Sequence, residues 1–340
     1  MLLHWWISWI LPALVINGIN FTPAKSAERG KTLFYHGYNY GSQTCYNPLS
    51  LMANASFDIL QNSTRNNNLS QLELANGFGN VGWNLSHARQ VVNQYGWRNF
   101  VRSEILPVTL SRRNAQYWPN YKLHLLGGGM TYIATAEWYE LHDCPYPRGL
   151  SLATMVVQHY LNEAVENNAY CGPNVDPVAD LMIFDPLGIV LFSLPGVPEF
   201  FAHKLLMTDW SFQPLYNFNN SQILNNGQKF VFKIPLPWTK RFRIFDLTGT
   251  EGLVGLSCQV NATDCLTLSG GYSTNKLLDV DEHTGVRKLT AQLVRAGGIF
   301  YDRNNSLLAS LILGGPRGYR ARLNIYPGVV GTKRVKPGWV

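Results

Sequence analysis

The last third of the chain alternates apolar and polar side chains, and this pattern constrains the fold more than any other feature. In Tyr319–Tyr326 one parity holds Tyr, Ala, Leu and Ile, and the other holds Arg, Arg, Asn and Tyr. A period of two places successive side chains on opposite faces of a β-strand. We therefore expect a ladder of short strands at Gln228–Pro237, Arg241–Thr248, Leu253–Asn261, Leu266–Ser273, Lys288–Asp302, Leu307–Gly314 and Arg317–Pro327.

A further strand region is expected nearer the start of the chain. We expect a strand or hairpin at Leu69–Leu85, which carries Leu72, Leu74, Asn76 and Phe78 on one parity. Its glycines have the spacing typical of barrel walls. Eight antiparallel strands make the smallest common closed barrel, and closure leaves no unpaired edge in lipid. The sequence thus predicts a mainly antiparallel β fold, a closed barrel of about eight strands with a large helical insertion. A soluble sandwich, which would show the same alternation, is the alternative.

Between the two strand regions lies a long block with the boundary residues of helices. Ser86 opens a run that stops before Pro107, a second run is interrupted at 127–129, and a third ends near Asn167. Proline disfavours helix at the residue before it and is favourable in a first turn. The predicted order is a signal peptide at 1–27, an irregular segment with the first strand or strands at 28–85, a helical module at 86–207 and barrel strands at 208–340.

The N-terminus has the pattern of an export signal. Trp5–Ile16 is an apolar run too short for a comfortable membrane span, and small residues follow at Ala24, Ser26 and Ala27. No Lys or Arg precedes the run, so an uncleaved anchor is the alternative. Together with the strand ladder, an export signal indicates the bacterial outer membrane.

The composition agrees with this location. Only 14% of the residues are charged and 13% are aromatic, and the basic residues behind the net charge of +7 are scattered. We therefore expect no nucleic-acid partner, but outer-membrane lipid with anionic headgroups and the barrel-assembly machinery. Seven Asn-x-Ser/Thr sequons would suit a secreted eukaryotic glycoprotein, a weaker alternative. The side chains expected to face lipid are Phe230, Phe232, Ile234, Leu236, Tyr319, Leu323 and Ile325.

The five cysteines contain no C-x-x-C pair, which argues against a zinc ribbon or a thioredoxin-like site. Cys258 and Cys265 flank Asn261-Ala262, where a two-residue turn would set them opposite each other within disulfide reach. In an oxidising compartment we expect them to bond. Cys144 and Cys171 bracket a predicted helix and could clip its ends together.

The helical module concentrates side chains that could carry chemistry. His159, Glu163 and Glu166 recur at i, i+4 and i+7 and so share one stripe of a helix. Facing helices can hold a metal ion with such groups, or place them for acid–base catalysis. The spacing is looser than in di-iron bundles, so a buried polar network that fastens the helices is the favoured interpretation. The candidate catalytic residues are His159, Glu163, Glu166, Glu137, Glu140 and His124.

Three aspartates, Asp176, Asp180 and Asp185, are expected to be structural. Asp185 precedes Pro186 and Asp176 precedes Pro177, where a carboxylate can cap the free N–H groups of a helix. A calcium loop would need more oxygen ligands at shorter spacing. No cofactor is expected.

A family resemblance rests on motifs between His124 and Gly188. In this order they resemble the helical segment of a family of uncharacterised bacterial outer-membrane β-barrel proteins, a domain of unknown function. The resemblance implies the location and the fold, and no activity. One departure is the C-terminus, Gly338-Trp339-Val340, because barrel proteins commonly end in an aromatic residue. The motifs are Glu137-Trp138-Tyr139-Glu140, Pro145-x-Pro147, His159-x-x-Asn162-Glu163-x-x-Glu166-Asn167, Asp176-x-x-x-Asp180 and Asp185-Pro186-x-Gly188.

Two functional hypotheses follow. The favoured one is an outer-membrane barrel without enzymatic activity, with a structural, transport or envelope-interaction role. The alternative is a membrane-embedded enzyme that acts on lipid or another cell-envelope substrate through the His and Glu side chains of the helical module. An enzyme needs those groups open to a cavity, whereas a fastening network needs them sealed. The sequence names no substrate.

Overall fold

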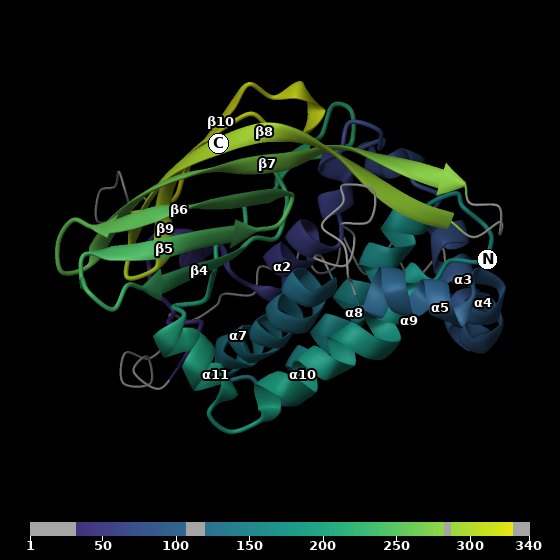
Figure 1. The fold of residues 1–340 in the computed structure, drawn as a ribbon, viewed down its shortest axis with the longest axis horizontal. Helices are drawn as coiled ribbons and strands as arrows, with labels where there is room; N and C mark the ends of the chain where they lie inside the picture. Colours follow the sequence, from purple (N-terminus) through teal and green to yellow (C-terminus); the bar gives the residue numbers. More distant parts are fainter. Residues whose placement is uncertain (1–31, 107–119, 282–286, 329–340) are drawn as a thin grey trace.

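The computed structural model describes residues 32–106, 120–281 and 287–328. It consists of a curved antiparallel sheet with a layer of helices along one side of it (Figure 1). The fold is mainly antiparallel β with a substantial helical part, as predicted. The predicted signal peptide, residues 1–27, lies outside the described residues.

The main sheet has eight strands in the order β1-β4-β5-β6-β7-β8-β9-β10, and β2 and β3 form a separate hairpin. In the described part of the chain β1 and β10 are the two edges and do not pair with each other. The sheet is therefore an open half-barrel, and closure into a barrel stays a prediction. The strands are β1 (Thr208–Asp209), β2 (Leu215–Asn217), β3 (Gln222–Leu224), β4 (Phe230–Pro235), β5 (Phe242–Thr248), β6 (Glu251–Gln259), β7 (Asp264–Asp281), β8 (Arg287–Arg303), β9 (Ser306–Leu313) and β10 (Ala321–Ile325).

The seven strands predicted in the last third of the chain are confirmed as β4 to β10. β7 is longer than predicted, and β10 is shorter because Pro316–Gly318 forms a short 3-10 turn. The predicted parity of the last strand also holds. Leu323 is exposed, whereas Arg322 and Asn324 are buried on the opposite face.

The early strand predicted at Leu69–Leu85 is wrong, because Leu74–Ser86 forms the helix α3. Its buried residues Gly77, Asn80, Val81 and Asn84 recur with helical spacing. A Cβ at Gly77 would lie 2.1 Å from the carbonyl oxygen of Ala164. This glycine therefore permits close packing of α3 on α8, and the eighth strand of the sheet is β1 instead.

The concave face of the sheet holds a hydrophobic core. The rings of Trp210, Phe245 and Phe300 lie 5.4–5.7 Å apart, centroid to centroid. Phe245 and Phe300 belong to β5 and β8, which are not neighbours in the sheet, so only a curved sheet brings them together. The buried residues of this core are Trp210, Phe212, Val231, Phe245, Leu247, Leu253, Phe300, Leu307, Ile312 and Tyr326.

The helical layer follows the predicted order, and at the Gly127–Gly129 triplet the helix continues but changes type. There a π-helical segment, η6, passes into the α-helix α7. A Cβ at Gly129 would lie 2.3 Å from the Phe192 ring and 2.6 Å from the carbonyl oxygen of Gly188, so the triplet allows α10 to approach. The helices are α2 (Pro48–Ala55), α3 (Leu74–Ser86), α4 (Ala88–Tyr95), α5 (Trp97–Phe100), η4 (Val101–Ile105), η6 (Asn120–Gly128), α7 (Gly129–Leu141), α8 (Pro147–Asn167), α9 (Asp176–Ala179), η7 (Asp180–Phe184), α10 (Asp185–Ser193), α11 (Val197–Glu199) and η8 (Phe200–Lys204).

The helical layer covers one margin of the convex face, beside β4 (Figure 1). Phe230 and Phe232 pack there against Met130, Trp138 and Phe192. The expectation that these two phenylalanines face lipid is therefore wrong. Alternation put them on the correct face, but the helices bury that part of it.

The predicted disulfide between Cys258 and Cys265 is also wrong, and all five cysteines are free. The register of β6 and β7 pairs Cys258 with Leu266 and Gln259 with Cys265. The two thiols consequently point to opposite faces of the sheet, because a shift of one residue reverses the face.

In the part of the chain that the structure describes, no single helix has the length and apolar composition to cross a membrane. Two consecutive helical segments meet these criteria only when taken together: Asp176–Ser193 and Val197–Lys204, which are bent by 91°.

Candidate functional site

The helical layer brings two histidines and an aspartate together from three separate elements. His124 lies on η6, His159 on α8 and Asp185 at the start of α10. Nδ1 of His124 lies 3.0 Å from Oδ1 of Asp185, and Nδ1 of His159 lies 2.9 Å from Oδ2 of the same carboxylate. Their potential ligand atoms all lie within 4.8 Å of one another, the spacing of a metal site.

The two contacts of Asp185 differ in kind. His124 makes a hydrogen bond with Oδ1. Nδ1 of His159 contacts Oδ2 of Asp185 at 2.9 Å without the alignment of a regular hydrogen bond, and Nε2 of His159 is buried without a partner. Buried polar atoms are nearly always hydrogen-bonded. Nε2 is therefore the ring nitrogen of His159 that no neighbouring group satisfies.

Two more buried carboxyl groups adjoin the cluster. Oδ2 of Asp180 lies 3.4 Å from Nε2 of His124, and Glu163 follows His159 by one turn of α8. Glu163 is only 2% exposed, and its Oε2 has no hydrogen-bond partner, like Oδ1 of Asp180. The cluster thus holds three carboxyl groups and two imidazoles in a largely buried position.

Burial and neighbouring charges shift the pKa values of the groups in this cluster. The two causes oppose each other at His124 and Asp185 and act together at Glu163 and Asp180. Burial alone would lower the pKa of His124, but the charge and hydrogen bond of Asp185 outweigh it and raise that pKa to about 9. Burial would raise the pKa of Asp185, but His159 and His124 hold it well below its usual range. Burial and neighbouring carboxylates raise the pKa values of Glu163 and Asp180 well above normal. Asp185 therefore carries the negative charge of the cluster.

The sequence found part of this cluster and missed the rest. His124, His159 and Glu163 were predicted candidates, but Asp180 and Asp185 were assigned structural roles. The capping role of Asp185 is wrong, because η7 runs into α10 without a break and Asp185 makes no capping hydrogen bond. Asp176 is the first residue of α9, and the N-cap position is held by Val175. One sequence feature could have shown that Asp185 is not a cap. It follows the apolar run Leu181–Phe184, and inside a continuous helix no free N–H groups need a capping side chain.

The other predicted carboxylates lie elsewhere. Glu137 accepts hydrogen bonds from the backbone N–H groups of Leu33, Phe34 and Tyr35, and burial raises its pKa to about 7. Glu137 therefore anchors the segment before α2. Glu166 is half-buried, one turn beyond Asn162 on α8.

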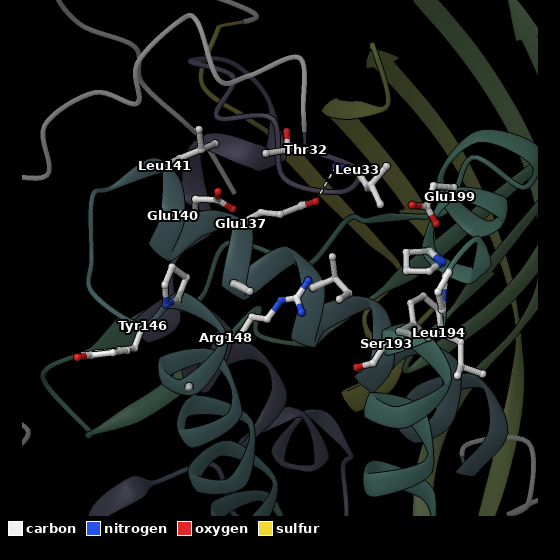
Figure 2. Close-up of a pocket in the computed structure, with 17 residues that line it drawn as sticks. Thr32, Leu33, Glu137, Glu140, Leu141, Tyr146, Arg148, Ser193, Leu194 and Glu199 are labelled. Carbon is white, nitrogen blue, oxygen red and sulfur yellow. Dashed lines mark hydrogen bonds between the residues drawn. The ribbon is translucent and has the colours of Figure 1, made fainter.

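A cavity of about 890 Å³ lies at the far end of α7 and α8 from the cluster. Figure 2 shows Arg148 reaching toward its middle, with Glu137 and Glu140 on the α7 side and Glu199 opposite. His124, His159 and Asp185 do not line this cavity. The cavity and the cluster are thus separate features of the helical layer.

The convex face of the sheet is the second candidate site. Beyond the margin that the helices cover, it presents a continuous set of exposed apolar side chains, which we call the convex apolar band. Two of them, Leu256 and Leu268, pair across β6 and β7 and are 53% and 59% exposed. The eleven residues of the band are Ile234, Phe242, Ile244, Val254, Leu256, Leu266, Leu268, Tyr272, Ile299, Leu313 and Leu323.

The concave face, in contrast, buries charge. Glu251 is fully buried and contacts both Lys229 and Arg322. Lys233 and Asp302 are also fully buried and pair with each other. Charged residues are almost never fully buried unless they are paired. The concave face therefore combines its hydrophobic core with paired buried charges, whereas the convex face carries the convex apolar band.

Comparisons with models of known protein families, with curated proteins and with solved structures found no match to this chain.

Proposed function

We propose that the protein is an exported protein of the bacterial outer membrane, and that its sheet meets lipid with the convex apolar band. The observation that carries this proposal is the exposure of eleven large apolar side chains on one continuous face. Soluble monomers rarely expose contiguous apolar patches larger than a few hundred Å². A lipid environment would remove this surface from water.

The distribution of charge across the sheet supports lipid. Transmembrane sheets alternate apolar side chains toward lipid with polar ones toward the interior. On β10, Leu323 points outward, whereas Arg322 and Asn324 are buried inside. On β6, Val254 and Leu256 point outward and Glu251 is buried inside.

Polar groups lie at both ends of the band. At one end Asp264 pairs with Arg303, at 2.8 Å, and also accepts a hydrogen bond from Tyr301. Toward the other end the exposed side chains include Arg295 and Lys276. Charged side chains thus lie at the two ends of the convex apolar band, with apolar side chains between them. This arrangement suits a surface that crosses a membrane from one aqueous side toward the other.

The remaining expectations from the sequence belong to the same proposal. They are export by a signal peptide, the resemblance to a barrel family, assembly by the barrel machinery, and closure of the sheet. Closure would satisfy the edges β1 and β10, because lipid offers no hydrogen bonds to an open strand. The role would be structural, in transport or in envelope interaction. An enzyme acting on envelope lipid is the second candidate, and the buried His and Asp cluster favours it only if substrate can reach it.

Flotation with lipid vesicles tests the proposal. Vesicles of phosphatidylethanolamine and phosphatidylglycerol are mixed with purified protein and centrifuged through a density gradient. We expect the wild type to float with the vesicles, and the double variant Leu256→Lys/Leu268→Lys to stay at the bottom. A lysine at the middle of a lipid-facing strand costs roughly 2–4 kcal/mol.

Leu215→Lys is the matched control, because Leu215 is an exposed strand leucine on β2, outside the band. It should float like the wild type. The proposal fails if the wild type stays at the bottom and forms a dimer in buffer that the double variant dissociates, because the band would then bind protein. It also fails if the folded double variant floats like the wild type.

A further inference from the structure

The arrangement of His124, His159 and Asp185 is independent of any lipid contact. Their three elements are separated by long stretches of sequence, yet their ligand atoms lie within 4.8 Å of one another. Two atoms that bind the same zinc ion lie roughly 3–3.5 Å apart, because each bond is about 2.0–2.2 Å long. The contacts of 2.9 and 3.0 Å between Asp185 and the two histidines are close to that spacing.

We propose that His124, His159 and Asp185 bind one divalent transition-metal ion of the zinc class. Imidazole and carboxylate ligands suit zinc and iron, and two histidines with one carboxylate leave coordination positions free. This is a site, and no reaction is assigned to it.

The Nε2 atom of His159 argues for a metal ion over a fastening network. His159 is 7% exposed, and its Nε2 has no hydrogen-bond partner, whereas Nδ1 contacts Oδ2 of Asp185 at 2.9 Å. A network that served only to hold helices together would satisfy Nε2 as well, because an unpaired buried group costs free energy. Nε2 of His159 is therefore available to bind a ligand.

His124 has the surroundings of a metal ligand. Such a histidine usually donates its second ring N–H to a carboxylate, which fixes the orientation of the ring. Here each ring nitrogen of His124 faces a carboxyl group: Asp185 lies 3.0 Å from Nδ1 and Asp180 lies 3.4 Å from Nε2. Whichever nitrogen binds the ion, the other retains a partner.

Glu163 and Gly128 complete the surroundings. Oε2 of Glu163 is buried without a partner one turn from His159, so it is available as a further ligand or as a partner of a bound water. A Cβ at Gly128 would lie 3.8 Å from Oδ1 of Asp185 and 3.9 Å from Cε1 of His159. Gly128 thus leaves open a space against the cluster that a methyl group would enter without a clash.

Direct metal binding tests the site. The full-length protein, stripped with a chelator and desalted, is titrated with Zn²⁺ alone, and retained zinc is measured by mass spectrometry after gel filtration. We expect one equivalent in the wild type and a rise in melting temperature. His159→Asn and Asp185→Asn should each lower the affinity by at least about tenfold, as losses of metal-site groups do.

His87→Asn is the matched control, because His87 is an exposed histidine of the same helical layer that stacks on Trp83. It should retain the full equivalent of zinc. Gly128→Ala is a second control beside the cluster: it keeps every ligand and adds a methyl group only in van der Waals contact with it, so it should fold normally and also retain the full equivalent of zinc.

A spectroscopic measurement gives an independent check. Cobalt(II) added to the stripped wild type should give visible d–d absorption bands of a nitrogen and oxygen site, which His159→Asn should lose. The proposal is overturned if the folded wild type retains no zinc, or if His159→Asn and Asp185→Asn bind it as the wild type does. Neither outcome depends on vesicle binding, so the test stands apart from the lipid proposal.

Discussion

Lys233 on β4 and Asp302 on β8 form an ion pair of 2.6 Å, although three other strands separate β4 from β8 in the sheet. Both side chains are fully buried. Lys233 also lies over the ring of Trp210, at 4.7 Å from its centroid. The pair can form only because the sheet curves enough for the concave faces of distant strands to meet.

Breaking this pair should therefore destabilise the protein strongly. Lys233→Met leaves Asp302 buried without its cation, and removal of one partner of a buried pair costs about 3–5 kcal/mol. The double variant Lys233→Met/Asp302→Leu should recover most of that loss, because no charge stays buried. Chemical denaturation measures the free energy of unfolding of each.

The pair of Lys122 and Asp246 is a matched control for Lys233, because these side chains are 30% and 23% exposed. Lys122→Met should cost no more than about 1 kcal/mol, as half-exposed ion pairs do. Equal losses for Lys122→Met and Lys233→Met would contradict the buried position of the second pair.

Glycine substitutions should separate close helix packing from helix propensity. Gly129→Ala places a methyl group against the Phe192 ring and the Gly188 carbonyl oxygen, and overpacking of this kind costs roughly 1–3 kcal/mol. Gly79→Ala, in α3, meets nothing within 4 Å and should stabilise by up to about 1 kcal/mol. Thermal unfolding of the two variants should shift in opposite directions, and a stabilising Gly129→Ala would refute the close approach of α10 to α7.

Asp58 should make stability depend on pH. Burial and the charge of Glu166 raise its pKa to about 7, whereas an unfolded aspartate has a pKa of about 3.9. Between these values the native protein binds more protons than the unfolded chain, so the contribution of this group falls as the pH rises from about 4 to 7. A difference of about three pKa units corresponds to roughly 4 kcal/mol, so Asp58→Asn should remove up to about 4 kcal/mol of this decrease in the free energy of unfolding.

Unfolding free energies of the wild type and Asp58→Asn, measured at pH 4, 5.5 and 7, provide the comparison. The variant should gain most over the wild type at pH 7 and least at pH 4. A gain that is largest at pH 4 would mean that the carboxylate is stabilised in the native protein.

The β6–β7 register should be visible in cysteine chemistry. Cys265 is buried on the concave face and Cys258 is half-buried on the other. Iodoacetamide should therefore modify Cys258 before Cys265 in the folded protein, and both at similar rates after denaturation. Mass spectrometry under non-reducing conditions should find no peptide in which the two are linked; such a peptide would require a register shifted by one residue.

The strand ladder was predictable because alternation is a local property. In β10 the outward and inward side chains follow from a period of two, which holds wherever the strand is placed. The start of α8 was predictable for a similar reason, since a proline such as Pro147 favours the first turn of a helix whatever lies elsewhere in the chain. The sequence also identified His124 and His159 as candidate functional groups.

Features that depend on contacts between distant segments were not predictable from the sequence. Leu74–Ser86 has strand-like alternation, but its packing on α8 through Gly77 makes it a helix. The register that separates Cys258 from Cys265 depends on the loop between β6 and β7, where a change of one residue reverses the face.

The sequence by itself thus determined the strand periodicity, the helical block and the kinds of side chain within each, because these depend on neighbours along the chain. Only the tertiary structure decided that Phe230 and Phe232 lie under helices while Leu256 and Leu268 stay exposed. It also decided that Asp185 faces His124 and His159 across three elements. Burial and the meeting of charges are properties of packed surfaces, and a linear pattern does not contain the packing.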